Sequence, residues 1–312
     1  MIWRIKKFMK YYFYSAGIVV FAICFAAILP FFTAFFDNQL VAMEIPQNNS
    51  EVAGIQKYNI PPISQKIPTP PVSARAVYIK DLTTQTILFE KNASERLPIA
   101  STTKIMTALV ASSFFKPETI LVVKSAAQIP GSKVGLSYGE DLTFGSMLYG
   151  MLLNSGNDAA YAIAENYPGG VLSFVSAMNK KVADLRLLNT HFENPAGFDG
   201  INHFSSAKDL DIITEEALKD PNLAKIFATK QTSITSVDKK YTHQLANLNK
   251  LLSSVKGVMG VKTGYTDIAK ENLVTLVDRD DHKILIVVLG SDDRFGESTK
   301  LIEWAYQNFQ WQ

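Results

Sequence analysis

The sequence predicts an α/β protein of the α+β type, in which one antiparallel sheet combines strands from both ends of a body at residues 72–312. Three observations predict it. Short runs rich in β-branched residues lie near both ends of that body, at 76–89 and 273–289, and helical apolar patterns fill the stretch between them. A long uncharged segment precedes the body, which adds a predicted N-terminal transmembrane helix.

Residues 1–10 are basic and residues 11–36 contain no charged side chain. A helix of 26 residues extends for about 39 Å, whereas a bilayer core is about 30 Å thick. Because basic residues precede the apolar segment and acidic ones follow it, the positive-inside rule places residues 1–10 in the cytoplasm and the body outside. A cleaved signal peptide is the alternative, although its apolar region is usually about 7 to 15 residues long. The sequence therefore predicts a single-pass protein of the cytoplasmic membrane.

Residues 37–71 are predicted to form a linker between this anchor and the body. They hold six of the 13 prolines and the polar run 47–50, and they show no sustained helical or alternating apolar period. Such a segment buries little surface and acts as a flexible, partly extended connection.

Within the body, each element is predicted from its apolar period and its end signals. The helix predicted at 206–218 begins with a serine cap at Ser206 and ends before Pro221. Residues Arg279 to His282 are predicted to form the turn of a hairpin, with Asp280 and Asp281 in solvent. The predicted strands are 76–79, 87–89, 273–277 and 284–289, and the predicted helices are 101–114, 142–153, 158–166, 171–187, 206–218 and 297–309.

Charge and cysteine content exclude several classes of protein. The formal net charge is +2, but outside the first ten residues 27 basic side chains face 29 acidic ones, so no basic field for nucleic acid remains. The single cysteine, Cys24, excludes an internal disulfide framework and a multi-cysteine zinc site. No metal is predicted, because the four histidines (His191, His203, His243 and His282) show no ligand-pair spacing.

Ser101 and Lys104 form a Ser-x-x-Lys pattern at the start of a predicted helix. A serine hydroxyl needs a base to become a nucleophile, and a lysine three residues later lies on the same helix face. Taken alone the pattern is weak and more often belongs to a capped surface helix. The same spacing recurs at Ser113/Lys116, Ser205/Lys208, Ser236/Lys239 and Ser253/Lys256.

Two further motifs follow in order and strengthen this interpretation. Ser155-Gly156-Asn157 begins 54 positions after Ser101, and Lys262-Thr263-Gly264 begins 107 positions after Ser155. Ser-x-x-Lys, Ser-Asp-Asn and Lys-Thr-Gly form the motif set of penicillin-binding proteins and class A β-lactamases, and this chain has glycine in the middle of the second motif.

From about Val72 to Trp304 the sequence resembles the low-molecular-mass penicillin-binding proteins that act as serine D-alanyl-D-alanine carboxypeptidases. The Ser-Gly-Asn form of the second motif is typical of this family. Further local matches are 98–100, 152–160, 189–192, 194–197, 249–252 and 260–266. The resemblance implies a penicillin-binding-protein and β-lactamase-like fold, with an antiparallel sheet flanked by helices and an all-helical subdomain.

The resemblance also implies an activity without a cofactor or metal. The enzyme would remove the terminal D-alanine from peptidoglycan stem peptides through an acyl-enzyme, and β-lactams would inhibit it. Ser101 would be the nucleophile, Lys104 its general base and Ser155 a proton shuttle.

Further residues would bind the substrate. Asn157 would orient it, Lys262 and Thr263 would hold its carboxylate, and Gly264 would let its backbone lie against the strand. The backbone amides of Ser101 and Tyr265 would form the oxyanion hole.

The sequence departs from the family at two positions. Family members often have glycine where this chain has Lys270, and some have a carboxylate-binding arginine in the segment where this chain has Leu248. Either Lys262 or Arg294 would then take over the binding of the carboxylate, and Arg294 lies in a further family-like stretch at 292–297.

Other activities stay open at this point. The alternatives are a β-lactamase, a D,D-endopeptidase, or a non-catalytic cell-wall-binding protein whose site has decayed. His191 and His203 are expected to be packing or capping residues.

Overall fold

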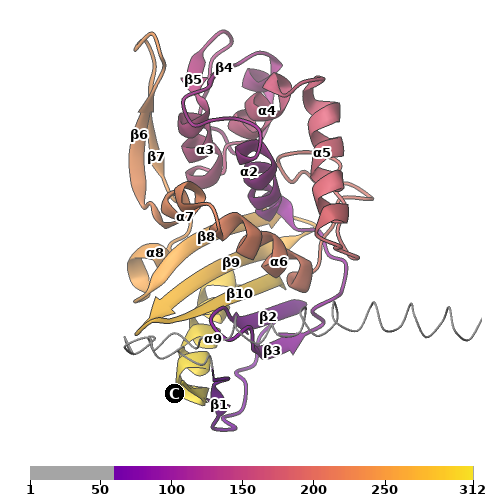
Figure 1. The fold of residues 1–312 in the computed structure, drawn as a ribbon, viewed down its shortest axis with the longest axis vertical. Helices are drawn as coiled ribbons and strands as arrows, with labels where there is room; N and C mark the ends of the chain where they lie inside the picture. Colours follow the sequence, from indigo (N-terminus) through magenta and orange to yellow (C-terminus); the bar gives the residue numbers. More distant parts are fainter. Residues whose placement is uncertain (1–59, 312) are drawn as a thin grey trace, which may run out of the picture. The chain divides into compact units, whose positions relative to one another are not determined.

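The computed structural model describes residues 60–311 (Figure 1). The predicted transmembrane helix at 11–36 and most of the predicted linker lie outside the described residues. Within residues 60–311, no helix combines the length and apolar character needed to cross a bilayer.

A five-stranded antiparallel sheet forms the centre of the body, in the order β3-β2-β10-β9-β8 (Figure 1). Strands β2 (Ala76–Asp81) and β3 (Ile87–Lys91) come from the start of the body. Strands β8 (Val258–Thr266), β9 (Lys270–Arg279) and β10 (His282–Ser291) come from its end. The prediction of one antiparallel sheet that combines strands from both ends of the body is therefore confirmed.

Both faces of the sheet are buried, which explains why its strands are continuous apolar runs. In β10, Leu285 and Val287 face the core shared with the helices, while Ile284 and Ile286 face a second core under the C-terminal helix. That helix, α9 (Arg294–Asn308), packs on β9 and β10 and continues into β11 (Phe309–Gln310), which pairs with β1 (Ile63–Ser64).

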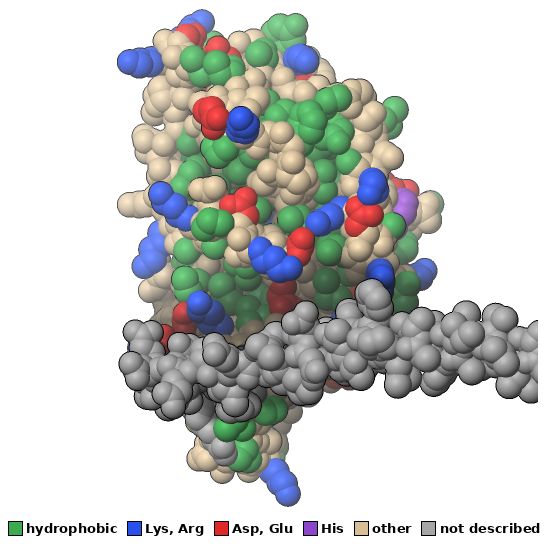
Figure 2. All heavy atoms as spheres, in the orientation of Figure 1, with side chains coloured by type: hydrophobic (Ala, Val, Ile, Leu, Met, Phe, Trp, Pro, Cys, Tyr) green, Lys and Arg blue, Asp and Glu red, His purple; other side chains and the backbone are tan. Residues whose placement is uncertain are grey.

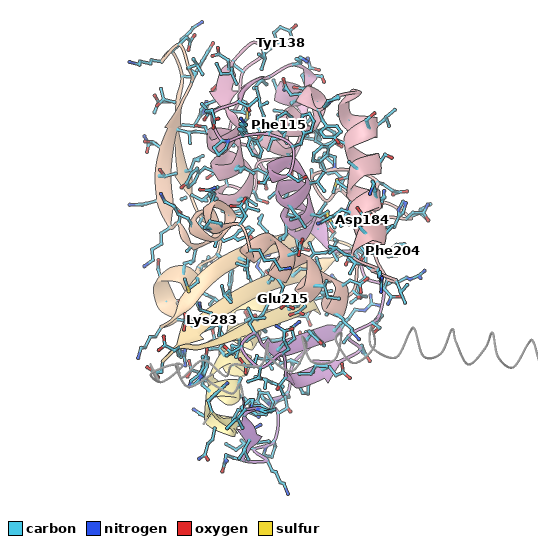
Figure 3. All side chains as sticks on the ribbon, in the orientation of Figure 1. Phe115, Tyr138, Asp184, Phe204, Glu215 and Lys283 are labelled. Atoms are coloured by element: carbon cyan, nitrogen blue, oxygen red, sulfur yellow. The ribbon has the colours of Figure 1, made fainter. Side chains whose placement is uncertain are left out.

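A helical subdomain is inserted between β3 and β8, as predicted. Lys80 of β2 forms ion pairs with Asp211 and Glu215 of α6 (Ala207–Leu218), which ties this subdomain to the sheet. Figure 3 labels Glu215 on α6. The subdomain contains η1 (Ala100–Thr103), α2 (Lys104–Ser112), η2 (Ser125–Gln128), α3 (Phe144–Leu153), α4 (Asn157–Asn166), α5 (Gly170–Asp184), α6 (Ala207–Leu218) and α7 (Pro221–Ala228). Two small two-stranded sheets, β4 (Ile120–Val122) with β5 (Asp141–Thr143) and β6 (Gln231–Thr235) with β7 (Thr242–Ala246), complete it, and α8 (Leu251–Ser254) leads into β8.

Several predicted boundaries were wrong. The helix predicted from residue 142 begins at Phe144, because Asp141–Thr143 pair with β4 as a strand. The helix predicted to end at residue 187 ends at Asp184. Helix α6 does end before Pro221, but Pro221 also begins α7. Proline is tolerated there because an N–H group in the first turn of a helix has no acceptor within the helix.

Basic and acidic side chains are interspersed on the face of the molecule shown in Figure 2. No extended surface of one sign is visible there. This distribution agrees with the near-neutral charge of the body.

Candidate active site

Ser101 and Lys104 meet at the junction of η1 and α2, next to the sheet. The Lys104 Nζ atom lies 2.9 Å from the Ser101 Oγ atom and 2.8 Å from the Asn157 Oδ1 atom, and it also donates to the Ala196 carbonyl at 2.6 Å. Ser101 is partly exposed, whereas Lys104 is completely buried. The structure therefore brings the first motif and part of the second into direct contact.

The backbone around Ser101 is closely packed on two sides. Gly197, with a φ of +93°, lies against the Ala100 carbonyl and the Ser101 nitrogen, and an added Cβ would overlap the Ala100 oxygen. A Cβ on Gly264 would lie 2.9 Å from the Ile99 oxygen and 3.1 Å from the Ser101 nitrogen. Gly264 therefore lets β8 lie close to the backbone of Ser101. The sequence had suggested only that this glycine makes room for the substrate.

The environment of Lys104 favours its neutral form. Burial lowers its pKa well below the ordinary value, and the nearby positive charge of Lys262 lowers it further. The carboxylate of Asp158 acts in the opposite direction. A neutral amine within hydrogen-bond distance of a partly exposed hydroxyl is able to remove its proton.

The second motif lies in a tight turn between α3 and α4. Ser155 is buried and has a φ of +58°. A Cβ on Gly156 would lie 2.7 Å from a Val134 methyl and 2.9 Å from the Asp158 carboxylate, so a side chain in the middle of this motif would require both neighbours to move. Within residues 60–311, no hydrogen bond joins the Ser155 hydroxyl to Ser101 or Lys104.

Both polar atoms of the Asn157 amide are engaged within the protein. Its Oδ1 accepts from Lys104, and its Nδ2 donates to the Pro130 carbonyl at 2.8 Å. This arrangement assigns Asn157 a contact with the lysine. Its predicted role in orienting the substrate stays a prediction.

Asp158 is a site-organising residue that the sequence interpretation did not identify. Its buried carboxylate accepts the backbone N–H groups of Val134, Gly135 and Leu136 at 2.9 to 3.1 Å. The loop that covers the second motif is thereby fixed in place. The signal was present in the sequence, since an acidic residue directly after Ser-Gly-Asn stands in the first turn of α4.

The third motif lies on β8, which is an edge strand of the sheet. Lys262 and Thr263 are buried, whereas Tyr265 is exposed. Burial and the positive charge of Arg294 lower the pKa of Lys262 to about 7. Its ammonium donates to the Thr263 carbonyl at 3.0 Å, and among the described residues it forms no ion pair. An anionic ligand would therefore find an unpaired cation here.

Arg294 contacts the third motif, and its role in binding the substrate carboxylate stays a prediction. Its Nη1 atom donates to the Gly264 carbonyl at 2.8 Å, and its Nε atom is buried with no hydrogen-bond partner within residues 60–311. Its guanidinium lies over the Phe295 ring, with the central carbon 4.9 Å from the ring centre. Leu248, at the position of the missing arginine, is exposed.

Lys270 lies at the start of β9 with a φ of +58°. This left-handed conformation favours glycine, which explains the glycine that relatives often carry there. Because the Lys270 side chain is exposed, the substitution strains one turn without filling the site.

Within residues 60–311, no three His, Cys, Asp or Glu side chains cluster as a metal site. His203 is buried and hydrogen-bonded to Thr103, and the Nδ1 atom of His191 lies 2.7 Å from the Asn202 carbonyl. These contacts fit the predicted packing and capping roles.

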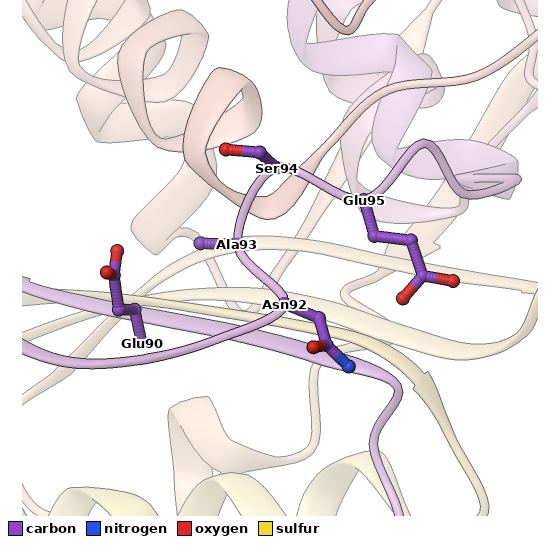
Figure 4. A pocket seen from close by; sticks show the side chains of 5 residues that line it. All are labelled: Glu90, Asn92, Ala93, Ser94 and Glu95. Carbon is purple, nitrogen blue, oxygen red and sulfur yellow. The ribbon is translucent and has the colours of Figure 1, made fainter.

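A separate surface hollow lies at the end of β3 (Figure 4). It is lined by Glu90, Asn92, Ala93, Ser94 and Glu95. None of the motif residues lines it.

Comparisons with known proteins agree with this geometry. A family model described as D-alanyl-D-alanine carboxypeptidase matches residues 63–293. D-alanyl-D-alanine carboxypeptidase DacF of Bacillus subtilis is 36% identical over 247 residues, which cover 76% of this chain and 63% of DacF. The D-alanyl-D-alanine carboxypeptidase of Streptomyces sp. K15 is 34% identical and matches over 76% of this chain and 88% of its own length.

Solved structures give the same result. The crystal structure of the Streptomyces K15 DD-transpeptidase superposes with a TM-score of 0.73 at 31% identity, over 77% of this chain and all of that one. A penicillin-binding protein homologue from Mycobacterium tuberculosis, described as evolved and putative, superposes with the same score at 29% identity. The part of the chain that matches DacF spans less than two thirds of that relative.

Proposed function

The chain belongs to the D-alanyl-D-alanine carboxypeptidase family, and from that premise we propose that it removes the terminal D-alanine from peptidoglycan stem peptides through an acyl-enzyme on Ser101. The observation that carries this proposal is the contact of the Ser101 hydroxyl with the buried Lys104 amine at 2.9 Å. Serine and lysine at this distance form a nucleophile with its own base.

In the proposed acylation step, neutral Lys104 takes the Ser101 proton while the Ser101 oxygen attacks the penultimate carbonyl carbon. The peptide bond to the last D-alanine breaks, and the leaving amine receives a proton through Ser155. Water then releases the shortened peptide. The backbone N–H groups of Ser101 and Tyr265 are the proposed oxyanion-hole donors. Losing one such donor typically costs about 3 to 4 kcal/mol of transition-state stabilisation.

Two cationic side chains and one hydroxyl group along β8 favour a substrate with a free carboxylate. Lys262, Thr263 and Arg294 lie along or against this strand, and Lys262 has no carboxylate partner among the described residues. We assign these three residues to the terminal carboxylate of the substrate.

This function is tested by incubating the full chain with a peptide that ends in D-Ala-D-Ala. The expected result is release of free D-alanine by the parent protein and none by Ser101→Ala. Peptide cleavage that leaves the terminal D-alanine attached would contradict a carboxypeptidase.

Arg294→Gln is expected to raise KM for such peptides about tenfold or more, because a charge-assisted hydrogen bond contributes about 1.5 to 3 kcal/mol. The alkaline limb of the pH profile should also move to higher pH. Lys262 must be charged to bind the carboxylate, and Arg294 lowers the pKa of Lys262. Without Arg294 this pKa rises, so Lys262 stays charged at higher pH.

The matched control is Arg186→Gln, which removes an exposed arginine and should leave KM and the pH profile unchanged. In the same assay, Leu248→Arg should lower KM or leave it unchanged. Equal KM values for the parent and Arg294→Gln would remove Arg294 from the site.

The membrane anchor is also proposed, on the sequence of residues 1–36 alone. The chain should stay in the membrane fraction after a high-salt wash, with the catalytic body accessible to external protease. A mature N-terminus found after residue 36 would instead demonstrate signal cleavage.

A further inference from the structure

We propose that His203 is a positioning residue for Lys104. It connects the helix that carries the lysine to the loop at residues 194–198, whose Ala196 carbonyl accepts from the lysine. The inference rests on the proposed function only in that Lys104 is taken as the base.

The imidazole of His203 bridges two segments through both ring nitrogens. Its Nε2 atom lies 2.8 Å from the Thr103 hydroxyl oxygen, one residue before Lys104. Its Nδ1 atom accepts the backbone N–H of Glu193 at 3.1 Å and lies 3.2 Å from the Asn194 Nδ2 atom. Because a backbone N–H only donates, Nδ1 carries no proton, and Nε2 must therefore donate to Thr103.

Asn194 passes this connection on to the site. Its Oδ1 atom accepts the backbone N–H groups of Ala196, Gly197 and Phe198 at 3.1, 2.7 and 3.0 Å, which sets the shape of the loop. The Ala196 carbonyl then accepts from Lys104 at 2.6 Å, and Gly197 packs against Ala100 and Ser101. Through Thr103 on one side and Asn194 on the other, His203 thus connects the start of α2 with Ala196, which contacts Lys104, and with Gly197, which packs against Ser101.

His203 itself is not suited to exchange protons in the reaction. It is 2% exposed, and burial lowers its pKa to about 4, with smaller contributions from the neighbouring basic groups of His191 and Lys104. Near neutral pH it therefore stays uncharged, with its single N–H directed at Thr103. Its contribution is the location of the lysine rather than proton transfer.

The experiment compares Thr103→Val with the matched control Thr103→Ser in penicillin acylation of the full chain. Valine keeps the shape of threonine but removes the acceptor for the imidazole, whereas serine keeps the hydroxyl. Thr103→Val should lower the maximal acylation rate about tenfold and change the half-saturating penicillin concentration less than twofold. Thr103→Ser should acylate at nearly the parent rate.

His203→Phe should show the same loss of rate, and the double variant should be no slower than the slower single variant, because both changes break one connection. If His203→Phe does not fold, the Thr103 pair decides. Equal rates for Thr103→Val and Thr103→Ser would overturn the proposal, as would a change confined to the half-saturating concentration.

A second measurement is independent of activity. Nitrogen NMR of the imidazole in Ser101→Ala should show a neutral Nε2–H form of His203 from pH 5.5 to 8. An Nδ1–H form would overturn the proposal even in a protein that no penicillin acylates. Failure of the parent to acylate, with the expected NMR result, would instead count against the proposed function alone.

Discussion

Lys104→Ala is expected to lower the rate of penicillin acylation by about 10²- to 10⁴-fold, the usual effect of removing a general base. The amine lies 2.9 Å from the Ser101 hydroxyl, and burial holds its pKa well below the ordinary value. No other titratable group in the described part of the chain contacts that hydroxyl. Stopped-flow or quenched labelling with a fluorescent penicillin measures the rate.

Two further variants make this test specific. Lys256→Ala removes an exposed lysine from another Ser-x-x-Lys pattern and should acylate at the parent rate. Lys104→Met keeps the buried volume without the amine, so it separates loss of the base from loss of packing. If folded Lys104→Met reacted as fast as the parent, Lys104 would not be the base.

Gly197→Ala is expected to lower the acylation rate at least tenfold and to reduce the melting temperature. The new methyl group would overlap the Ala100 oxygen and lie 2.9 Å from the Ser101 nitrogen, so the segment that carries the nucleophile must move. A small displacement of reacting groups is sufficient for a large loss of rate. Acylation kinetics and thermal unfolding measure the two effects.

Gly139→Ala is the matched control for this change. Its φ is +79°, close to the +93° of Gly197, but a Cβ there meets nothing within 4 Å. It therefore carries the left-handed backbone strain of about 1 to 2 kcal/mol without the collision. It should lower the melting temperature and leave acylation unchanged. Similar acylation losses in both variants would show that the packing against Ser101 is unimportant.

The central sheet was predictable because its signals are local. The predicted hairpin is confirmed, but its turn is shorter than the predicted Arg279 to His282: only Asp280 and Asp281, with φ values of 54° and 65°, lie between β9 and β10. Burial on both faces produces the continuous apolar runs from which these strands were predicted. The contact of Ser101 with Lys104 follows from a spacing of one helical turn. The spacing alone recurs at four other places, so the two later motifs were needed to select this pair.

Other parts of the molecule depend on contacts that a single sequence does not reveal. The strands β6 and β7 are half-exposed and polar, and they are stabilised by pairing with each other rather than by an apolar run. The carbonyl of Ala196 reaches Lys104 from 92 residues away, and a backbone oxygen has no sequence signature. Arg294 was a candidate only because another arginine is missing at Leu248, and its contact with the Gly264 carbonyl has no signal in the sequence.

The most direct test of the account is the intact mass of the protein after incubation with a penicillin. A β-lactam is a cyclic amide that Ser101 should attack as it attacks the substrate, leaving a covalent adduct. The parent is predicted to gain the mass of one drug molecule, on the peptide that contains Ser101, and Ser101→Ala is predicted to gain none. An adduct that persists in Ser101→Ala would contradict the assignment of the nucleophile and, with it, the proposed mechanism.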